Sequence, residues 1–180
     1  MAACELISLT GDNNCPDNDG GIYTTMITDC TNIVDVIFNT EGQITNFVMA
    51  SLGQWSKYEF DVNDDTAFYN QTQNDANKTV SQQAFFKFGG LSQLMTNFAD
   101  GIKDCCCLVA VHYTNSSLAF VQGIDRVNSI WKKSFKYPKA KVNILTDTSA
   151  NQSRCEITID STGKTFSKIT TLTIADLEAL

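Results

Sequence analysis

The sequence predicts a mainly β (α+β) protein, with a β-sandwich or barrel-like core of antiparallel strands, one flanking amphipathic helix and a long arm between strands. Short runs of β-branched and aromatic residues alternate with turn formers along most of the chain. One mid-chain segment instead has apolar residues at helical spacing. At 180 residues, the chain has the length of a single domain.

The chain opens on polar turn formers. Residues 12–21 read DNNCPDNDGG, so we expect residues 1–20 to form an N-terminal arm outside the main sheet. Val, Ile, Thr and Tyr are then concentrated in predicted strands at 21–28, 33–38 and 44–49, the last two joined by a turn at 39–42.

Two alternating segments flank a long polar one. Segment 55–62 places Tyr58, Phe60 and Val62 on one face, and segment 80–88 places Val80, Gln82, Ala84, Phe86 and Phe88 together. We expect the two to form an extended hairpin with the polar loop 63–79 as its tip. A compact domain seldom keeps so long a loop without a use. Since this loop carries Phe68 and Tyr69, we expect it to be an arm that docks on a neighbouring subunit.

Leu91, Leu94, Met95, Phe98 and Ile102 recur at helical spacing and predict one helix of about three turns. Segments 105–113 and 118–124 are predicted to form the central hairpin of the core. Later strands are predicted at 142–146, 155–160 and 164–169, with a turn at 161–163. A capping pattern that begins at Thr173 predicts a short terminal helix.

Charge limits the classes of partner. Twenty acids against 13 bases give a net charge of −7, and there is no long basic run. A protein that grips DNA or an anionic membrane would need a basic face. There is also no apolar stretch of membrane-spanning length and no signal-peptide pattern. We therefore expect a chain made in the cytoplasm, with no membrane partner.

The seven cysteines are odd in number and include the triple Cys105-Cys106-Cys107. Reduced thiols that fill space are the expectation. Side chains on a strand alternate faces, so the triple cannot chelate one zinc ion well. His112 could form a catalytic site with Cys105 or Cys107, but no nucleophile signature accompanies it, and a structural histidine is the favoured interpretation. We expect no enzyme activity.

Two acidic clusters, at 12–20 and 61–65, partly match calcium-binding loops. Both lack the glutamate that closes such a loop and the helices that flank it, so turn chemistry accounts for them. No metal or other cofactor is expected. The bases between Arg126 and Lys141 are interleaved with Trp131 and Phe135. Nucleic-acid binding is one interpretation; the preferred one is an edge segment, or a patch that meets the acidic arm of the next subunit in a ring.

The order of these segments resembles that of the tail-tube proteins of bacteriophages and related injection systems. The resemblance covers about residues 20–170: a strand feeds a polar loop, a strand returns (VSQQAFFKF), one helix follows (LSQLMTNFADGI), and a strong hairpin comes next (CCCLVAVHYTNSSLAFVQGI). The opening arm is similar to that of structural proteins from phages of Bacteroides-like hosts.

The resemblance implies a structural virion protein of a phage tail, a tube or a connector ring, assembled in the host cytoplasm. Copies of the chain would form a ring, hexameric or higher, that binds other tail proteins and lets DNA pass without specific binding. Phe68, Tyr69, Trp131 and Phe135 would lie at assembly interfaces, and Glu59, Asp61, Gln82 and Gln83 would line the channel. The alternative is a capsid-decoration or fibre-attachment β-sandwich that binds a ligand and forms no ring.

Overall fold

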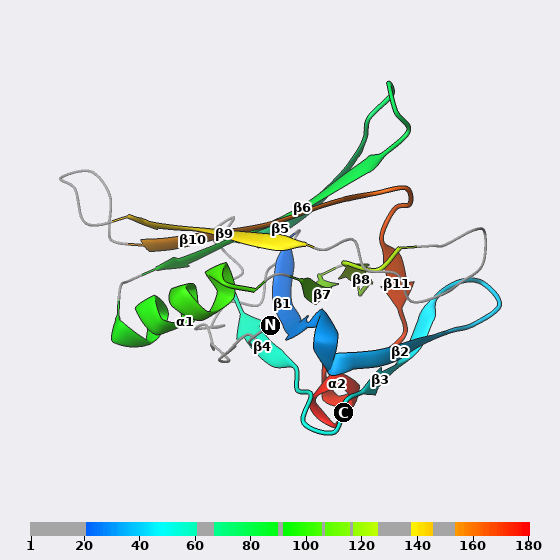
Figure 1. Cartoon of the computed structure of the whole chain (residues 1–180), viewed down its shortest axis with the longest axis horizontal. Helices are drawn as coiled ribbons and strands as arrows, with labels where there is room; N and C mark the ends of the chain where they lie inside the picture. Colours follow the sequence, from blue (N-terminus) through cyan, green and yellow to red (C-terminus); the bar gives the residue numbers. More distant parts are fainter. Residues whose placement is uncertain are drawn as a thin grey trace.

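The computed structural model describes residues 21–60, 67–89, 92–105, 107–115, 117–125, 138–145 and 154–180. These residues form a mainly β fold of two sheets, one of seven strands and one of four (Figure 1). The four-stranded sheet lies above the seven-stranded one in that view, with one helix beneath it. Neither set of described strands closes on itself. The sequence left a sandwich and a barrel-like core open, and the described strands do not form a closed barrel.

The seven-stranded sheet is mixed. Its strands in spatial order are β2 (Ile33–Phe38), β3 (Ile44–Met49), β11 (Lys168–Thr170), β8 (Ala119–Gln122), β7 (Leu108–Thr114), β1 (Ile22–Asp29) and β4 (Ser56–Glu59). β3 and β11 pair in parallel, and the other neighbours pair antiparallel. The β2–β3 and β7–β8 hairpins confirm the two hairpins predicted in these regions.

The four-stranded sheet is antiparallel throughout, in the order β5 (Ala67–Gln73), β6 (Val80–Gly89), β10 (Arg154–Gly163) and β9 (Lys139–Leu145). The ends of β5 and β6 project from the body of the molecule as a hairpin (Figure 1). The alternation predicted for 80–88 is confirmed, since Val80, Ala84 and Phe86 are buried while Ser81 and Gln83 are exposed.

Two hydrophobic clusters stabilise this arrangement. One lies between the sheets and includes Phe60, Phe86, Leu108, Ile157 and the buried face of the helix α1 (Gln93–Lys103). The other lies on the second side of the seven-stranded sheet, where α2 (Ile174–Glu178) inserts Leu177 among residues that include Phe47 and Val111. Burial of this kind is the main favourable term in folding.

Both predicted helices are confirmed, and each begins at a capping residue. The Ser92 hydroxyl accepts a hydrogen bond from the Met95 amide at 3.2 Å at the start of α1. Thr173 and Asp176 form the predicted capping box of α2.

Three local predictions are wrong. The expected hairpin between 55–62 and 80–88 does not form, because β4 pairs with β1 in one sheet while β6 pairs with β5 and β10 in the other. Within the predicted polar loop 63–79, residues Ala67–Gln73 form a strand, β5, and a turn follows it. An edge strand with one exposed face can carry this many Asn, Gln and Thr residues, because their side chains point into water.

The third error is the turn at 161–163, which belongs to β10. Ser161 and Thr162 pair with Gln82 and Ser81, so the strand continues to Gly163. Ser161 is buried there because its hydroxyl has polar partners between the sheets.

Candidate functional site

A hydrogen-bonded polar network crosses the interior between the two sheets. Thr25 on β1, His112 on β7 and Gln122 on β8 contribute from one sheet, and Gln82 on β6 and Ser161 on β10 contribute from the other. All five side chains are buried. Successive side chains on a strand point to opposite faces of the sheet, and each of these five lies on the face that looks toward the other sheet. The five side chains therefore meet between the two sheets.

The hydrogen bonds show which ring nitrogen of His112 carries a hydrogen. The Gln122 amide nitrogen donates to the Ile159 carbonyl at 2.9 Å and the Gln82 carbonyl at 3.2 Å, so its oxygen is the acceptor that faces His112 Nε2 at 3.1 Å. His112 Nε2 therefore carries the hydrogen, and Nδ1 accepts from the Thr25 hydroxyl at 3.0 Å. Burial lowers the pKa of His112 to about 4, partly offset by the Gln122 hydrogen bond, so the ring is neutral at pH 7.

This environment is that of a structural histidine. His112 and Thr25 have no exposed surface, so no substrate reaches either side chain. Cys105 and Cys107, the candidate nucleophiles, are both in disulfides. The His112 network joins the two sheets.

Tyr69 belongs to the same interior, which corrects its prediction as an arm residue. Its ring lies 4.7 Å from the His112 ring, and its hydroxyl hydrogen-bonds the Ser167 hydroxyl. Burial raises the pKa of the Tyr69 hydroxyl above its ordinary value. Because β5 is a strand, Tyr69 points inward where its neighbour Phe68 points outward. A side chain packed in this way is not free to dock on another subunit.

The predicted channel residues do not form one surface. Gln82 is 1% exposed and donates to the Thr165 carbonyl at 3.3 Å, so its prediction as a channel residue is wrong. Gln83 is exposed on the four-stranded sheet and donates to Asp160 at 2.9 Å. Glu59 lies in the other sheet, on β4, where it pairs with Lys57 at 2.9 Å. Asp61 lies outside the described residues.

The outer face of the four-stranded sheet is one candidate contact surface, with both aromatic and charged side chains. Phe68 on the edge strand β5 and Phe85 on the adjacent β6 stack on it, with ring centroids 5.2 Å apart. Phe68 is 38% exposed. Polar and charged side chains surround the pair in cross-strand register: Asn70, Gln83, Lys87, Lys139, Lys141, Arg154, Glu156, Thr158 and Asp160. Exposed aromatic groups set among polar ones are typical of a contact surface.

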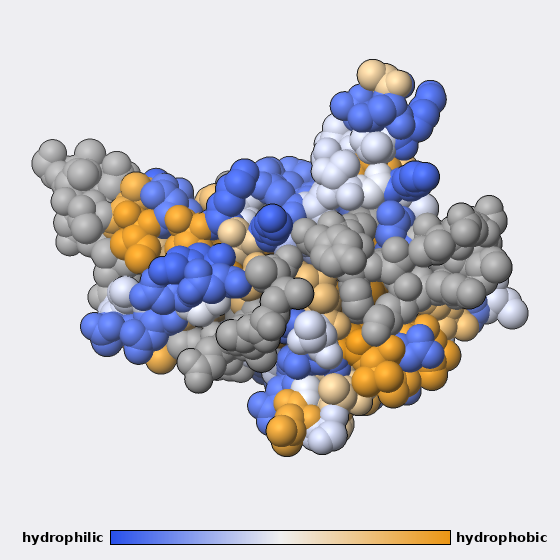
Figure 2. Space-filling model, in the orientation of Figure 1, coloured by the Kyte–Doolittle hydropathy of each residue, from blue (hydrophilic) through white to orange (hydrophobic). Residues whose placement is uncertain are grey.

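The second candidate surface is the outer face of the β2–β3 hairpin. Ile37 is 44% exposed and Val48 38% exposed, and Asp35 lies beside Val48 in the register. Figure 2 shows apolar residues gathered over β2 and β3, below the four-stranded sheet. The sequence did not reveal this surface, because an exposed Ile or Val in a strand reads as core.

The remaining predicted positions lie outside the described residues. These are Trp131, Phe135, the basic segment up to residue 137, and the acidic clusters at 12–20 and 61–65. Within the described part of the chain, no group of three or more His, Cys, Asp or Glu side chains is arranged to hold a metal ion. No helix in that part is long and apolar enough to cross a membrane.

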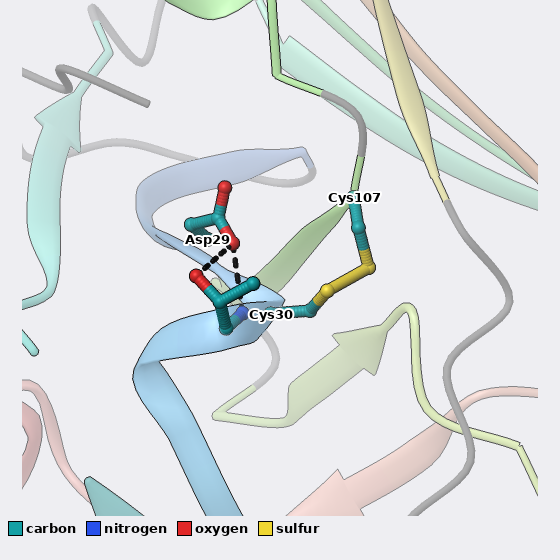
Figure 3. The surroundings of a disulfide bond; sticks show 4 residues. Asp29, Cys30 and Cys107 are labelled. Carbon is teal, nitrogen blue, oxygen red and sulfur yellow. Dashed lines mark hydrogen bonds between the residues drawn. A yellow bond between two sulfur atoms is a disulfide. The ribbon is translucent and has the colours of Figure 1, made fainter. Parts of the chain in front are cut away.

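The prediction of reduced, space-filling cysteines is wrong for Cys30, Cys105 and Cys107, which are in disulfides. Cys30 and Cys107 form a disulfide with each other where the β1–β7 ladder ends, next to the pair Asp29 and Leu108 (Figure 3). The Cys30 amide also donates to the Cys107 carbonyl at 3.1 Å. Asp29 holds the 3-10 turn Cys30–Asn32 by accepting from the Thr31 amide at 2.7 Å. Cys155, in contrast, is a buried free thiol.

Neither a protein-family model nor a curated protein sequence matches the chain. The class that the structure itself defines is a mainly β protein of two sheets joined by a buried polar network. Its candidate functional surfaces are two exposed sheet faces.

Proposed function

We propose that this chain is a structural subunit of a phage tail, which forms homo-oligomeric rings of a tail tube or of a connector. The observation that carries the proposal is the stacked pair of exposed Phe68 and half-buried Phe85, on the two strands of an open four-stranded sheet whose ends project as a hairpin. A surface of this kind is an assembly site rather than a reaction centre. The mainly β fold and single mid-chain helix agree with the architecture that the resemblance implies.

In this proposal the partners are further copies of the chain, in a ring that is hexameric or higher, and other phage tail proteins. DNA passes through the ring without specific binding, and no membrane is involved. The protein resides in the virion tail after assembly in the host cytoplasm. Glu59 and Gln83 remain candidates for the channel wall, and Phe68 for the subunit contact.

Negative-stain microscopy and sedimentation velocity of the purified chain test the proposal. We expect annular particles whose mass is a multiple of the 19.8 kDa chain. A chain that stays monomeric at all concentrations, with no annular or stacked form, would refute it.

A matched pair of variants tests the role of the aromatic pair. Phe68→Ser removes one ring of the stack and is expected to reduce association while leaving the fold intact. Leu118→Ser is the control, because Leu118 is exposed to a similar extent, 41%, but lies in the β7–β8 turn. Equal loss of association in both variants would mean that general surface hydrophobicity, and not this face, drives assembly.

The second candidate is a capsid-decoration or fibre-attachment module. The same Phe68–Phe85 pair, flanked by the amides of Asn70 and Gln83, could hold a sugar or a peptide. This function predicts a monomer, or an oligomer without a central channel, together with ligand binding that Phe68→Ser abolishes.

A further inference from the structure

The outer face of the four-stranded sheet differs in charge from the rest of the chain. Four bases lie on it, Lys87, Lys139, Lys141 and Arg154, against two acids, Glu156 and Asp160. The other described residues include five bases and ten acids. A positive face on an otherwise acidic molecule is complementary to the acidic surface of another copy.

Local ion pairs neutralise part of this face. Asp160 accepts from Lys141 at 3.3 Å, and Glu156 pairs with Arg154 at 2.7 Å. Lys139 is exposed at the edge of the sheet, on β9. The face therefore keeps an excess of positive charge, with Lys139 and Lys141 on the edge strand β9, opposite the edge strand β5 that carries Phe68.

The outer face of the β2–β3 hairpin has the opposite character. Residues 33–49 include Asp35 and Glu41 and have no Lys or Arg. Both acids are exposed, and Asp35 shares its face with Val48 and Ile37. This face is thus apolar with negative charge, whereas the sheet face is aromatic with positive charge.

We infer that the β2–β3 face of one copy docks on the outer face of the four-stranded sheet of the next copy. Ile37 and Val48 would cover the Phe68–Phe85 pair, and Asp35 and Glu41 would lie opposite Lys139 and Lys141. The hairpin lies well below the four-stranded sheet in Figure 1, so the two surfaces are on different parts of the molecule. A contact between different surfaces is head-to-tail, and it repeats until it closes as a ring or extends as a filament.

This inference rests on the proposed function and deepens it by naming the two contacting surfaces. It assigns the face that carries Gln83 to the subunit contact, which leaves Glu59 as the candidate for the channel wall.

A charge exchange tests the pairing. One variant is Lys139→Glu/Lys141→Glu, another is Asp35→Lys/Glu41→Lys, and a third combines all four changes. In sedimentation velocity at low salt, each double variant is expected to raise the concentration needed for association by about tenfold or more, because like charges then face each other. The combined variant is expected to recover most of the native association, since opposite charges face each other again.

Lys103→Glu/Lys164→Glu is the matched control. Both lysines are exposed and lie off the proposed surfaces, and the change in net charge is the same as in the first variant. Circular dichroism verifies the fold of every variant. If the first variant does not fold, Lys139→Gln/Lys141→Gln replaces it and is expected to weaken association in the same direction. Raising the salt concentration is expected to weaken association of the native chain.

Two results would overturn the inference while leaving the proposed function in place. The first is rings that form equally well in the native chain and the double variants; the second is a combined variant that fails to recover. A native chain that never self-associates would instead remove the proposed function itself. DNA is the alternative occupant of the positive face, and fluorescence anisotropy with a DNA oligonucleotide tests it. A monomeric chain whose DNA binding is lost in Lys139→Glu/Lys141→Glu would overturn the docking of a second copy.

Discussion

His112 Nε2 donates a hydrogen bond to the side-chain oxygen of Gln122 across 3.1 Å, between two neighbouring strands of the seven-stranded sheet. The same Gln122 side chain then donates to the backbone carbonyls of Gln82 and Ile159 in the four-stranded sheet. One amide therefore satisfies polar groups from both sheets. Buried polar groups are costly unless they are paired, so this arrangement favours one relative position of the two sheets.

The first prediction concerns the dependence of stability on pH. The pKa of His112 is about 4 in the folded chain, against 6.5 for an ordinary histidine, because the ring is buried. The unfolded chain therefore takes up a proton at a higher pH than the folded chain does. Stability from this group is fully present above pH 6.5 and is lost as the pH falls toward 4. The loss amounts to about 3 kcal/mol.

Urea unfolding of the native chain and of His112→Gln, at pH 7.5 and pH 4, measures this effect. His112 is the only histidine in the chain, so the variant removes the whole contribution of that residue type. The carboxylates titrate in both proteins, so their contribution to the pH dependence of stability cancels when the two proteins are compared. We expect the native chain to lose about 3 kcal/mol more than the variant over this range. Equal losses would show that His112 is not held neutral.

The second prediction concerns Gln122 itself. Gln122→Met keeps the approximate length of the side chain but leaves His112 Nε2 and the two carbonyls without their partner. Unsatisfied buried groups of this kind cost about 1–3 kcal/mol each, so we expect the free energy of unfolding to fall by about 2–5 kcal/mol. Chemical denaturation at pH 7 is the measurement.

Gln83→Met is the matched control for that change. Gln83 is an exposed glutamine whose amide donates to Asp160 at 2.9 Å, so its replacement should change stability by less than about 0.5 kcal/mol. Similar effects at positions 83 and 122 would mean that the interior network contributes little to stability.

The sequence predicts most of the strands and both helices because their signals are local. Alternation identifies the buried face of β6, and spacing at three and four residues identifies α1. Which strands pair is a different matter. β4 pairs with β1 and β6 with β5, and nothing within the segment 55–62 distinguishes this from the expected hairpin with 80–88. Pairing depends on contacts between residues distant in sequence.

The candidate surfaces were harder to predict than the strands. Tyr69 and Gln82 carry polar atoms, which in isolation favour an exposed position, yet the interior supplies hydrogen-bond partners for both. Ile37 and Val48 show the reverse, since apolar side chains lie on an outer face. Phe68 was identified because an aromatic residue stands out in a polar segment, although its stacking partner Phe85 lies on another strand.

The third prediction concerns the disulfide between Cys30 and Cys107, which closes a loop with a sequence separation of 77 residues. A cross-link over a loop of this length stabilises the fold by about 4 kcal/mol, mainly by restricting the unfolded chain. We expect Cys30→Ala/Cys107→Ala to lower the free energy of unfolding by about this amount. A peptide digest of the unreduced native protein should contain the two cysteines linked.

Cys155 supplies the control within the same chain. It is a buried free thiol, and burial, with a smaller effect of the Glu156 charge, raises its pKa to about 11. Alkylation at pH 8 is expected to modify Cys155 only after denaturation, because the thiolate is the reactive form and the native fold excludes the reagent. Cys30 and Cys107 should resist alkylation even in the denatured chain until a reductant is added. Their modification without reductant would show that the disulfide is absent, and the loop would then be held by the β1–β7 ladder alone.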